Sequence, residues 1–179
     1  MKLDLMYALE ILSQVQKKHP EAIVAGGFLR DLYFGKKFKD IDIFVTNPVG
    51  FISFDFIAET KYDMTYSTDS EISEVQKLWY DTIGTVINYS SPIEVNTICV
   101  PSGDLIARVQ EHDFDFCQVY TDGKQIYGVE ILQQVQQTKE VTLVQCENAK
   151  QLERSLRRWD RFQEKYPGFT LKYKEGIYR

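Results

Sequence analysis

The stretch "AGGFLRDLYFGKKFKDIDIF", residues 25–44, decides how the chain builds a site. It opens on adjacent glycines, continues through an apolar segment that contains an Arg-Asp pair, and ends where acidic and apolar residues alternate. The alternation continues to residue 45, and a period of two is typical of a β-strand. The strand predicted here has two faces, one with Ile41, Ile43 and Val45 and the other with Asp40, Asp42 and Phe44.

Asp40 and Asp42 are therefore expected on one face of one strand. Their Cα atoms would lie about 6.5–7 Å apart, at a rise of about 3.3 Å per residue. Two unpaired carboxylates at this spacing repel and raise each other's pKa, and a shared divalent cation removes that repulsion. Two such ions about 4 Å apart stabilise both the attacking and the leaving oxygen of a phosphoryl displacement. The pattern favours a magnesium site, while a solvated sheet edge is the plainer alternative.

The glycines point to the same chemistry. Gly26 and Gly27 stand where a short apolar strand is expected to pass into a helix, so their N–H groups can approach a phosphate at the helix N-terminus. Arg30 follows one helical turn later and is expected to reach a phosphate or to pair with a local carboxylate. A simple turn would explain the glycines alone, but the order and spacing of all these residues favour a phosphate site.

The rest of the chain alternates between helical and extended patterns. "SGDLIARVQEH" is expected to be a helix capped by Ser102, and residues 50–80 are left as a helix or an irregular insertion that could bind an acceptor. The other predicted elements are helices over 3–18, 27–35, 129–137 and 148–165, a strand before Gly26, a hairpin with strands near 84–89 and 93–99, a strand and short return strand around a turn at Asp122-Gly123 within 114–128, and an extended segment over 140–146.

These elements predict an α+β fold, a small mixed sheet flanked by helices. The 179 residues suit one compact unit with a small appendage. We expect residues 1–146 to form a catalytic head and residues 147–179 a helical extension packed on that head.

Composition narrows the class of protein. A net charge of −5 argues against indiscriminate binding of nucleic acid over the whole surface but allows a local basic patch. Cys99, Cys117 and Cys146 are widely spaced and are read as buried free thiols in a reducing compartment. No apolar run approaches the roughly 18 residues of a membrane span, and the N-terminus lacks a signal-peptide pattern. We therefore expect a soluble cytoplasmic protein without a membrane partner.

"VAGGFLRDLYFGKKFKDIDIFV", residues 24–45, resembles the head-domain signature of the tRNA CCA-adding enzymes and bacterial poly(A) polymerases, members of the DNA polymerase β-like nucleotidyltransferase superfamily. The resemblance implies a polymerase β-like palm, with Asp40 and Asp42 as catalytic metal ligands for Mg²⁺ or Mn²⁺. It also implies that Gly26, Gly27, Arg30 and Asp31 bind the nucleotide. The matching positions are Gly26, Gly27, Arg30, Asp31, Gly35, Asp40 and Asp42.

A weaker resemblance concerns the third carboxylate. "DFDFCQVYTDG", residues 113–123, is similar to the family's Arg-Arg-Asp-Phe-Thr-Ile-Asn-Ala segment, which implies that Asp113 is catalytic and binds metal. Glu111 and His112 replace the two arginines. Asp115, expected on the same strand face, is the fallback metal ligand. Glu94, in a segment similar to the family's Val-Glu-Val-Thr-Thr strand, is a further candidate.

"LERSLRRWDRFQEKYPGFTL", residues 152–171, is similar to the family's Arg-rich helix, and Arg158 and Arg161 match arginines expected to bind the nucleotide. The family's base-reading Glu-Asp-x-x-Arg motif has no faithful copy here, so selection of C or A is not implied. A solvated arginine face paired with neighbouring acids is the plainer reading. Trp159 and Tyr166 are read either as core residues or as platforms for a base.

The sequence thus predicts a metal-dependent nucleotidyltransferase. It would move a nucleoside monophosphate from ATP or another NTP to a hydroxyl acceptor, such as an RNA or tRNA 3′ end, and release pyrophosphate. The form expected is a stand-alone head of the kind encoded by phages. Two rivals stay open: a toxin-like or antibiotic-modifying transferase acting on a protein, tRNA or small molecule, and a catalytically inactive nucleotide-binding module. The nucleotide, the acceptor and the oligomeric state are left open.

Overall fold

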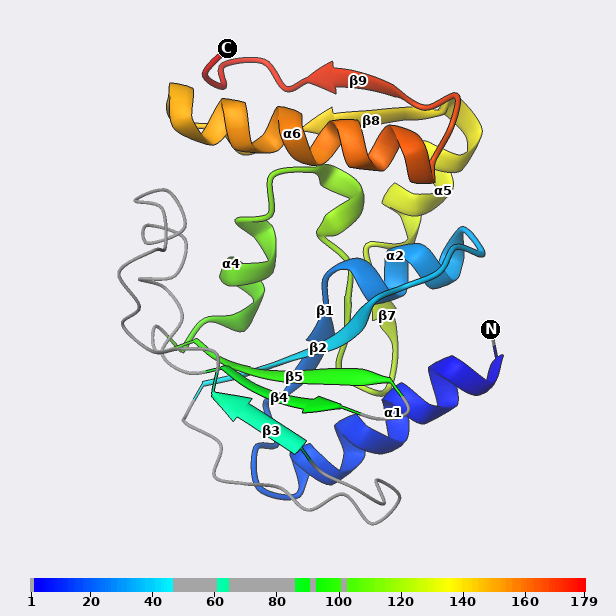
Figure 1. The fold of residues 1–179 in the computed structure, drawn as a ribbon, viewed down its shortest axis with the longest axis vertical. Helices are drawn as coiled ribbons and strands as arrows, with labels where there is room; N and C mark the ends of the chain where they lie inside the picture. Colours follow the sequence, from blue (N-terminus) through cyan, green and yellow to red (C-terminus); the bar gives the residue numbers. More distant parts are fainter. Residues whose placement is uncertain (1, 47–60, 65–85, 91–92, 101–102) are drawn as a thin grey trace.

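A computed structural model describes residues 2–46, 61–64, 86–90, 93–100 and 103–179 (Figure 1). Most of the predicted 50–80 segment lies outside these residues. The helices are α1 (Lys2–Gln16), α2 (Gly27–Tyr33), α4 (Leu105–Gln110), the 3₁₀ helix η1 (Asp115–Cys117), α5 (Val129–Thr138) and α6 (Ala149–Lys165). The strands are β1 (Ile23–Ala25), β2 (Asp40–Val45), β3 (Lys61–Met64), β4 (Val86–Ser90), β5 (Glu94–Cys99), β6 (Tyr120–Thr121), β7 (Ile126–Tyr127), β8 (Glu140–Leu143) and β9 (Thr170–Tyr173).

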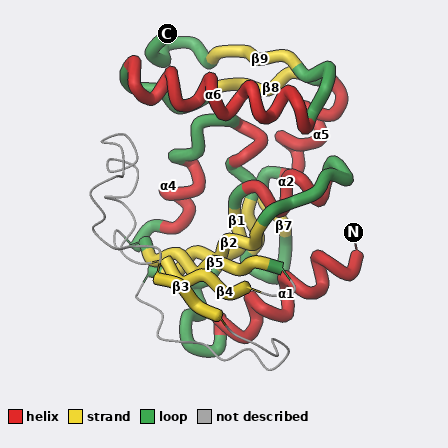
Figure 2. The backbone as a smooth tube through the Cα atoms, in the orientation of Figure 1, coloured by secondary structure: helices red, strands yellow, loops and turns green. Residues whose placement is uncertain are grey.

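The described strands form a mixed sheet of seven strands in the order β3-β4-β5-β2-β1-β6-β7. Strands β2 and β5 are parallel neighbours, and the other pairs in this sheet are antiparallel. A second sheet pairs β8 with β9 in parallel, and α6 lies alongside it (Figures 1 and 2). The predicted α+β class, with a small mixed sheet flanked by helices, is confirmed.

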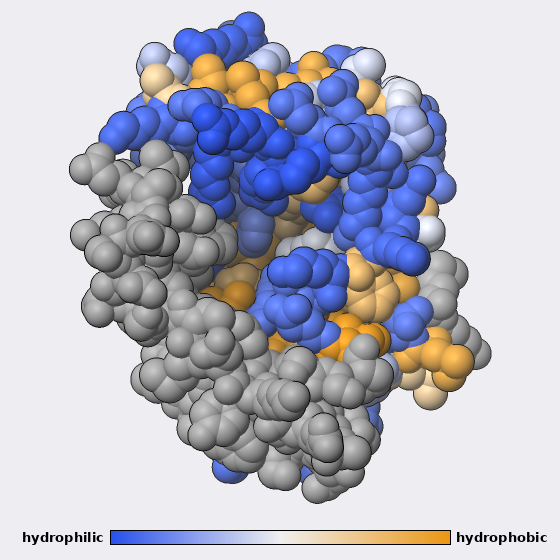
Figure 3. All heavy atoms as spheres, viewed as in Figure 1, coloured by the Kyte–Doolittle hydropathy of each residue, from blue (hydrophilic) through white to orange (hydrophobic). Residues whose placement is uncertain are grey.

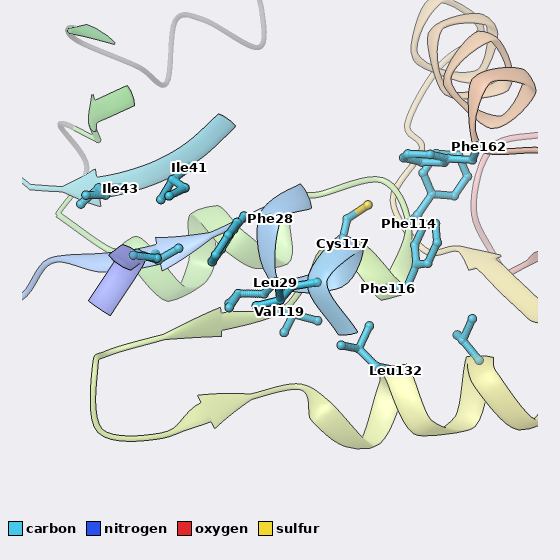
Figure 4. Close-up of a cluster of buried hydrophobic side chains, with 14 of the residues drawn as sticks. Phe28, Leu29, Ile41, Ile43, Phe114, Phe116, Cys117, Val119, Leu132 and Phe162 are labelled. Carbon is cyan, nitrogen blue, oxygen red and sulfur yellow. The ribbon is translucent and has the colours of Figure 1, made fainter. Parts of the chain in front are cut away.

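Strand β2 separates two apolar clusters, as its alternation predicts. Ile41, Ile43 and Val45 belong to the larger cluster, which also contains residues of α1, α2, η1 and α6 (Figure 4). Phe44, on the other face, packs in a smaller cluster that includes residues of α4. Asp40 and Asp42 share this second face but are only partly buried. The apolar end of the face is thus covered, while its acidic end stays open.

The prediction of a strand at the start of residues 114–128 is wrong for the residues before Tyr120. Residues 115–117 form η1, and β6 begins only at Tyr120. Phe116 and Cys117 are consecutive and both buried, so the segment does not alternate as a half-buried strand would. It turns instead, and Phe114 and Phe116 pack edge-on against Phe162 of α6, with ring centroids 5.4 and 5.1 Å away. Cys117 is therefore buried as expected, but not within a strand.

Two further local predictions need correction. The cap of α4 is Asp104, whose Oδ1 accepts a hydrogen bond from the Ala107 N–H at 2.9 Å, and not Ser102, which lies outside the described residues. Strand β9 was not predicted, because its "TLKY" sequence is too short to give a clear period. The other expected helices and both strands of the β4–β5 hairpin are present with boundaries shifted by a few residues.

The described part of the chain contains no helix long and apolar enough to cross a lipid bilayer. Cys99, Cys117 and Cys146 are buried free thiols, as their apolar surroundings in the sequence indicate. The aromatic contacts of η1 with α6 hold the C-terminal helix against the rest of the molecule. The division into a head and a C-terminal extension at residue 147 stays a prediction.

Candidate functional site

An asparagine side chain joins the two aspartates of β2. Because β2 and β5 are parallel and in register, Asp40 lies beside Glu94 and Asp42 beside Asn96. The Asn96 Nδ2 group donates to Asp42 Oδ1 at 2.9 Å and reaches Asp40 Oδ2 at 3.3 Å. A single amide therefore bridges one oxygen of each carboxylate. Exposed Lys39 adds a looser contact, 3.5 Å from Asp40 Oδ2.

The carboxylate of Asp42 is hard to ionise. Burial is the main cause and the charge of Asp40 the second, and together they raise the pKa of Asp42 from 3.8 to about 7. Glu94 adds to this rise in pKa, while the Asn96 hydrogen bond and the charge of Lys39 oppose it. Near neutral pH the pair thus lacks a positive partner strong enough to hold both carboxylates ionised. A divalent cation would supply that charge.

The donor set fits magnesium, which is usually bound by one or two carboxylates together with water and substrate phosphate oxygens. Asp40 and Asp42 supply two carboxylates on one strand face, and Glu94 is the register neighbour of Asp40. Among the described residues, no three His, Cys, Asp or Glu side chains are gathered tightly enough to form a complete metal site by themselves. A cation here would therefore need oxygens from other groups, from water or from a phosphate.

The structure does not bring Asp113 to the aspartate pair. Arg158 donates to Asp113 Oδ1 at 2.5 Å, and the Ser155 hydroxyl donates to Asp113 Oδ2 at 2.8 Å, so both carboxylate oxygens are occupied by α6. Asp115 is also placed elsewhere. Its Oδ1 accepts the Phe116 N–H at 2.7 Å, and burial, opposed by hydrogen bonds that include Thr142, raises the pKa of its carboxyl. Of the three candidates for the third carboxylate, only Glu94 lies beside Asp40 in the sheet.

Gly26, between β1 and α2, has a conformation that favours glycine. Its φ is 90° and its ψ is −148°, a backbone region that is essentially restricted to glycine. A Cβ atom at this position would lie 3.4 Å from Asp42 Oδ2. A Cβ on Gly27 would lie 3.0 Å from the guanidinium of Arg30. The paired glycines therefore let the helix N-terminus lie directly against the acidic site.

Arg30 is held by protein groups and takes the second of its two predicted roles. Its Nε donates to Asp31 Oδ1 at 2.8 Å and to the Tyr166 hydroxyl at 3.0 Å, and its guanidinium lies 4.6 Å from the centre of the Phe162 ring. The Asp31 carboxylate also accepts hydrogen bonds from Tyr166 and Lys165. Arg30 and Asp31 are both buried, so they form an internal ion pair.

A cavity of about 310 Å³ joins the glycine turn to α6. Figure 3 shows hydrophilic side chains gathered over α6, with the surface hollowed below them. Arg154, Arg158 and Arg161 recur every three or four residues, so one face of the helix points into this space. The full lining is Gly26, Gly27, Arg30, Asp42, His112, Cys117, Arg154, Arg158, Arg161 and Phe162.

The charges of the cavity favour an anion beside a carboxylate. Four arginines line it together with a single aspartate, and the N-terminus of α2 opens onto the same space. His112 is another lining residue, and its Nδ1 lies 2.7 Å from the Val109 carbonyl. Burial lowers the pKa of His112 to about 4, so the ring is neutral at physiological pH. It is a partly buried neighbour of the site, and no acidic partner lies within bonding distance in the described contacts of the ring.

Most predicted site residues therefore meet at one place. Gly26, Gly27, Arg30, Asp42, Arg158 and Arg161 line the cavity, and Asp40 is tied to Asp42 through Asn96. Asp31, Asp113 and Asp115 do not line it. Trp159 and Tyr166 are buried in the aromatic core, which favours the packing role for both.

Sequence reasoning missed Asn96 and Ser155. Asn96 belongs to the site only because β5 pairs with β2 in parallel and in register, and a hairpin pattern does not reveal which third strand it joins. Arg154 belongs to the arginine face expected of this helix, since it lies four residues before Arg158. The hydrogen bond of Ser155 to Asp113 depends on the position of η1, which was predicted as a strand.

No family model matches this chain, and no curated protein matches it. Its structure is similar to that of a CCA-adding enzyme solved in complex with CTP, with a TM-score of 0.57 and 13% sequence identity over 96% of this chain and 40% of that chain. A tRNA-processing enzyme solved in an apo form is also similar, with a TM-score of 0.49 and 12% identity over 78% of this chain and 36% of that one. The fold of this chain is thus similar to that of part of the CCA-adding enzyme, of which it spans about 40%.

Proposed function

We propose that this protein is a metal-dependent nucleotidyltransferase that moves a nucleoside monophosphate from an NTP to a hydroxyl acceptor and releases pyrophosphate. The observation that carries the proposal is the cavity itself. It places the Gly26-Gly27 turn, the Asp42 carboxylate and three arginines of α6 around one space. A triphosphate needs a helix N-terminus, cationic side chains and a carboxylate-bound metal, and this space offers the first two beside carboxylates suited to the third.

In this proposal Asp40 and Asp42 hold Mg²⁺ or Mn²⁺, and Glu94 supports them from the neighbouring strand. When bound, the metal neutralises charge on the phosphate oxygens and stabilises the attacking and leaving oxygens. The N–H groups at the start of α2 bind phosphate oxygens. Arg154 and Arg161 face the triphosphate from α6. Positioning and charge neutralisation supply most of the rate enhancement, as is usual for phosphoryl transfer.

Arg158 and Arg30 act differently from the other arginines. Arg158 is ion-paired with Asp113, so it contributes to the positive field of the cavity while holding η1 against α6. Arg30 is ion-paired with Asp31 and fixes the first turn of α2 beside the site. Both are proposed to position the nucleotide site through these contacts, and Asp31 and Asp113 support them.

The acceptor proposed is an RNA 3′ end, with tRNA as one candidate. One solved structure of similar fold is that of a CCA-adding enzyme with CTP, which supports a nucleotide substrate. Arg30 forms an ion pair with Asp31, and Arg158 forms one with Asp113. These pairings favour a second candidate function, a module that binds nucleotides without turnover. A transferase that modifies a protein or small molecule would use the same metal site and differ only in its acceptor.

The test is label transfer. The protein is incubated with each α-³²P-labelled NTP, with Mg²⁺ or Mn²⁺, and with bulk RNA, tRNA or protein extract as acceptor. The proposal expects label on RNA from the wild type and none from Asp42→Asn. Label on protein alone would replace the RNA acceptor with a protein. NTP binding without any transfer would establish the inactive module, and transfer that persists in Asp42→Asn would remove the metal role of this residue.

A further inference from the structure

Asn96 has two chemically different ends, and only one of them has a partner. The side chain is 8% exposed. Its Nδ2 group lies within hydrogen-bond distance of Asp40 Oδ2 and Asp42 Oδ1. Its Oδ1 atom is buried and accepts no hydrogen bond from the described residues. A buried carbonyl oxygen without a donor costs free energy, so this orientation of the amide leaves the side chain half satisfied.

The position of Nδ2 is the position that a shared cation would need. A donor that bridges one oxygen from each carboxylate stands between them, and it reduces their repulsion as a cation would. A neutral amide does this only in part, because it carries no net positive charge. A cation that binds these same two oxygens, Asp40 Oδ2 and Asp42 Oδ1, would take the place of the N–H group.

Rotation of the amide about its Cβ–Cγ bond would give the unpaired Oδ1 atom a partner and would remove the N–H group from the position of the cation. It would take the N–H group away from the cation and turn Oδ1 toward it. Amide carbonyl oxygens suit Mg²⁺ and Mn²⁺ as carboxylate oxygens do. No third acidic side chain among the described residues completes a metal group with Asp40 and Asp42, so a neutral oxygen in this position would fill a vacant place in the donor set.

We infer that Asn96 is a metal ligand that exchanges its two ends. Without a cation its NH₂ group bridges Asp40 and Asp42, and with a cation its Oδ1 atom joins them as a third protein oxygen. This inference rests on the proposed metal site at the aspartate pair. It assigns to that site a residue that the sequence did not single out, and it makes metal binding depend on a neutral side chain of β5.

An alternative role for Asn96 predicts the opposite change in metal affinity when the side chain is removed. If the amide were only a clamp that competes with the cation, its removal would free the carboxylates and strengthen metal binding. If Oδ1 is a ligand, its removal weakens metal binding. The test is therefore Mn²⁺ affinity, measured by electron paramagnetic resonance of the free ion in titrations without nucleotide.

Asn96→Ala is expected to weaken Mn²⁺ binding about tenfold, within the range seen when a single group supporting a metal site is lost. Asn96→Val provides a second variant that favours the strand, in case the alanine variant folds poorly. Thr97→Val is the matched control, since Thr97 is the next residue on β5 and is buried, and it should bind Mn²⁺ like the wild type. Unchanged or tighter binding in both Asn96 variants would overturn the inference.

The same titration separates this inference from the proposed function. If the wild type and Asp42→Asn bind Mn²⁺ equally, the metal site itself is refuted. If Asp42→Asn loses binding while the Asn96 variants keep it, only the role of Asn96 is refuted. A second readout is the Asn96 side-chain amide in ¹H–¹⁵N spectra, assigned by its absence in Asn96→Asp. Addition of Mg²⁺ should shift these protons upfield as they leave the carboxylates, and no shift at saturating Mg²⁺ would contradict the exchange.

Discussion

Gly26 and Asp42 lie so close that a Cβ atom on Gly26 would stand 3.4 Å from Asp42 Oδ2. The contact joins the turn at the start of α2 to the metal-binding candidate on β2. Their backbones are neighbours as well, since β1 and β2 pair with Ala25 opposite Asp42. The turn proposed to bind phosphate and the carboxylate of the proposed metal site are thus fixed relative to each other by the sheet.

The first prediction concerns this turn. Gly26→Ala should lower the free energy of unfolding by about 1–3 kcal/mol, because its backbone region is essentially closed to other residues. It should also lower label transfer at least tenfold. Gly35→Ala is the control, since Gly35 has φ 64° and no atom within 4 Å of an added Cβ. It should lose stability in urea unfolding but keep its activity, and equal activity of the two variants would contradict the prediction.

The second prediction follows from the raised pKa of Asp42. Between its ordinary value of 3.8 and about 7, the folded protein holds a proton on this group that the unfolded chain has released. The free energy of unfolding should therefore fall as pH rises through this window, by up to about 1.4 kcal/mol per pH unit. Urea unfolding in EDTA, from pH 4.5 to 7.5, should show a shallower fall in Asp42→Asn.

His112 titrates in part of the same window with the opposite sign, but it does so in both proteins, so the difference between them isolates the aspartate. Parallel curves would show that Asp42 has an ordinary pKa. Saturating Mg²⁺ at pH 7.5 should raise the stability of the wild type and leave Asp42→Asn unchanged.

A third prediction uses two arginines of α6. Arg161 lines the cavity, whereas Arg157 is 75% exposed and pairs with Glu153. Arg161→Ala should weaken binding of a fluorescent NTP about tenfold, a loss of about 1.4 kcal/mol, and should reduce the salt dependence of binding. Arg157→Ala should bind like the wild type. Equal losses in both variants would show that α6 acts only through its overall charge.

The fourth prediction separates the candidates for the third carboxylate. Glu94→Gln should weaken Mn²⁺ binding several-fold, because Glu94 neighbours Asp40 in the sheet. Asp113→Asn should leave Mn²⁺ affinity unchanged, since both oxygens of Asp113 are held by α6. It should instead lower stability by about 2 kcal/mol through the loss of its charged partner. Loss of Mn²⁺ binding in Asp113→Asn would support the assignment of Asp113 as a metal ligand, as the sequence resemblance implies.

A fifth prediction concerns the buried ion pair. Tyr166→Phe removes the hydroxyl that contacts both Arg30 and Asp31 and should cost about 1–1.5 kcal/mol in urea unfolding. Its ring packing is preserved, so NTP binding should change little. A tenfold loss of NTP affinity with unchanged stability would show that Tyr166 serves the nucleotide directly.

The predictions made from sequence succeeded where local patterns were sufficient. The alternation of residues 40–45 predicted both faces of β2, and the paired glycines predicted the start of α2. Helical spacing predicted α6 and its arginine face, although the plainer reading of a solvated face could not be dismissed without the cavity. These are features in which neighbours along the chain decide the outcome.

Long-range pairing decided the parts that the sequence could not provide. Asn96 meets Asp40 and Asp42 across more than 50 residues, through a parallel strand pairing that no local pattern specifies. Asp113 was expected at the metal because its segment resembles the family's Arg-Arg-Asp segment, in which the aspartate precedes a strand. The packing of Phe114 and Phe116 against α6 produces a 3₁₀ turn instead, which points the Asp113 carboxylate to Arg158.

The most direct test of the central claim is a crystal structure of the protein soaked with Mn²⁺ and a non-hydrolysable NTP. We predict an anomalous peak between the Asp40 and Asp42 carboxylates, with the triphosphate running from the Gly26 turn toward Arg161. A peak elsewhere, or a nucleotide bound away from the cavity while Asn96 still bridges the aspartates, would contradict it.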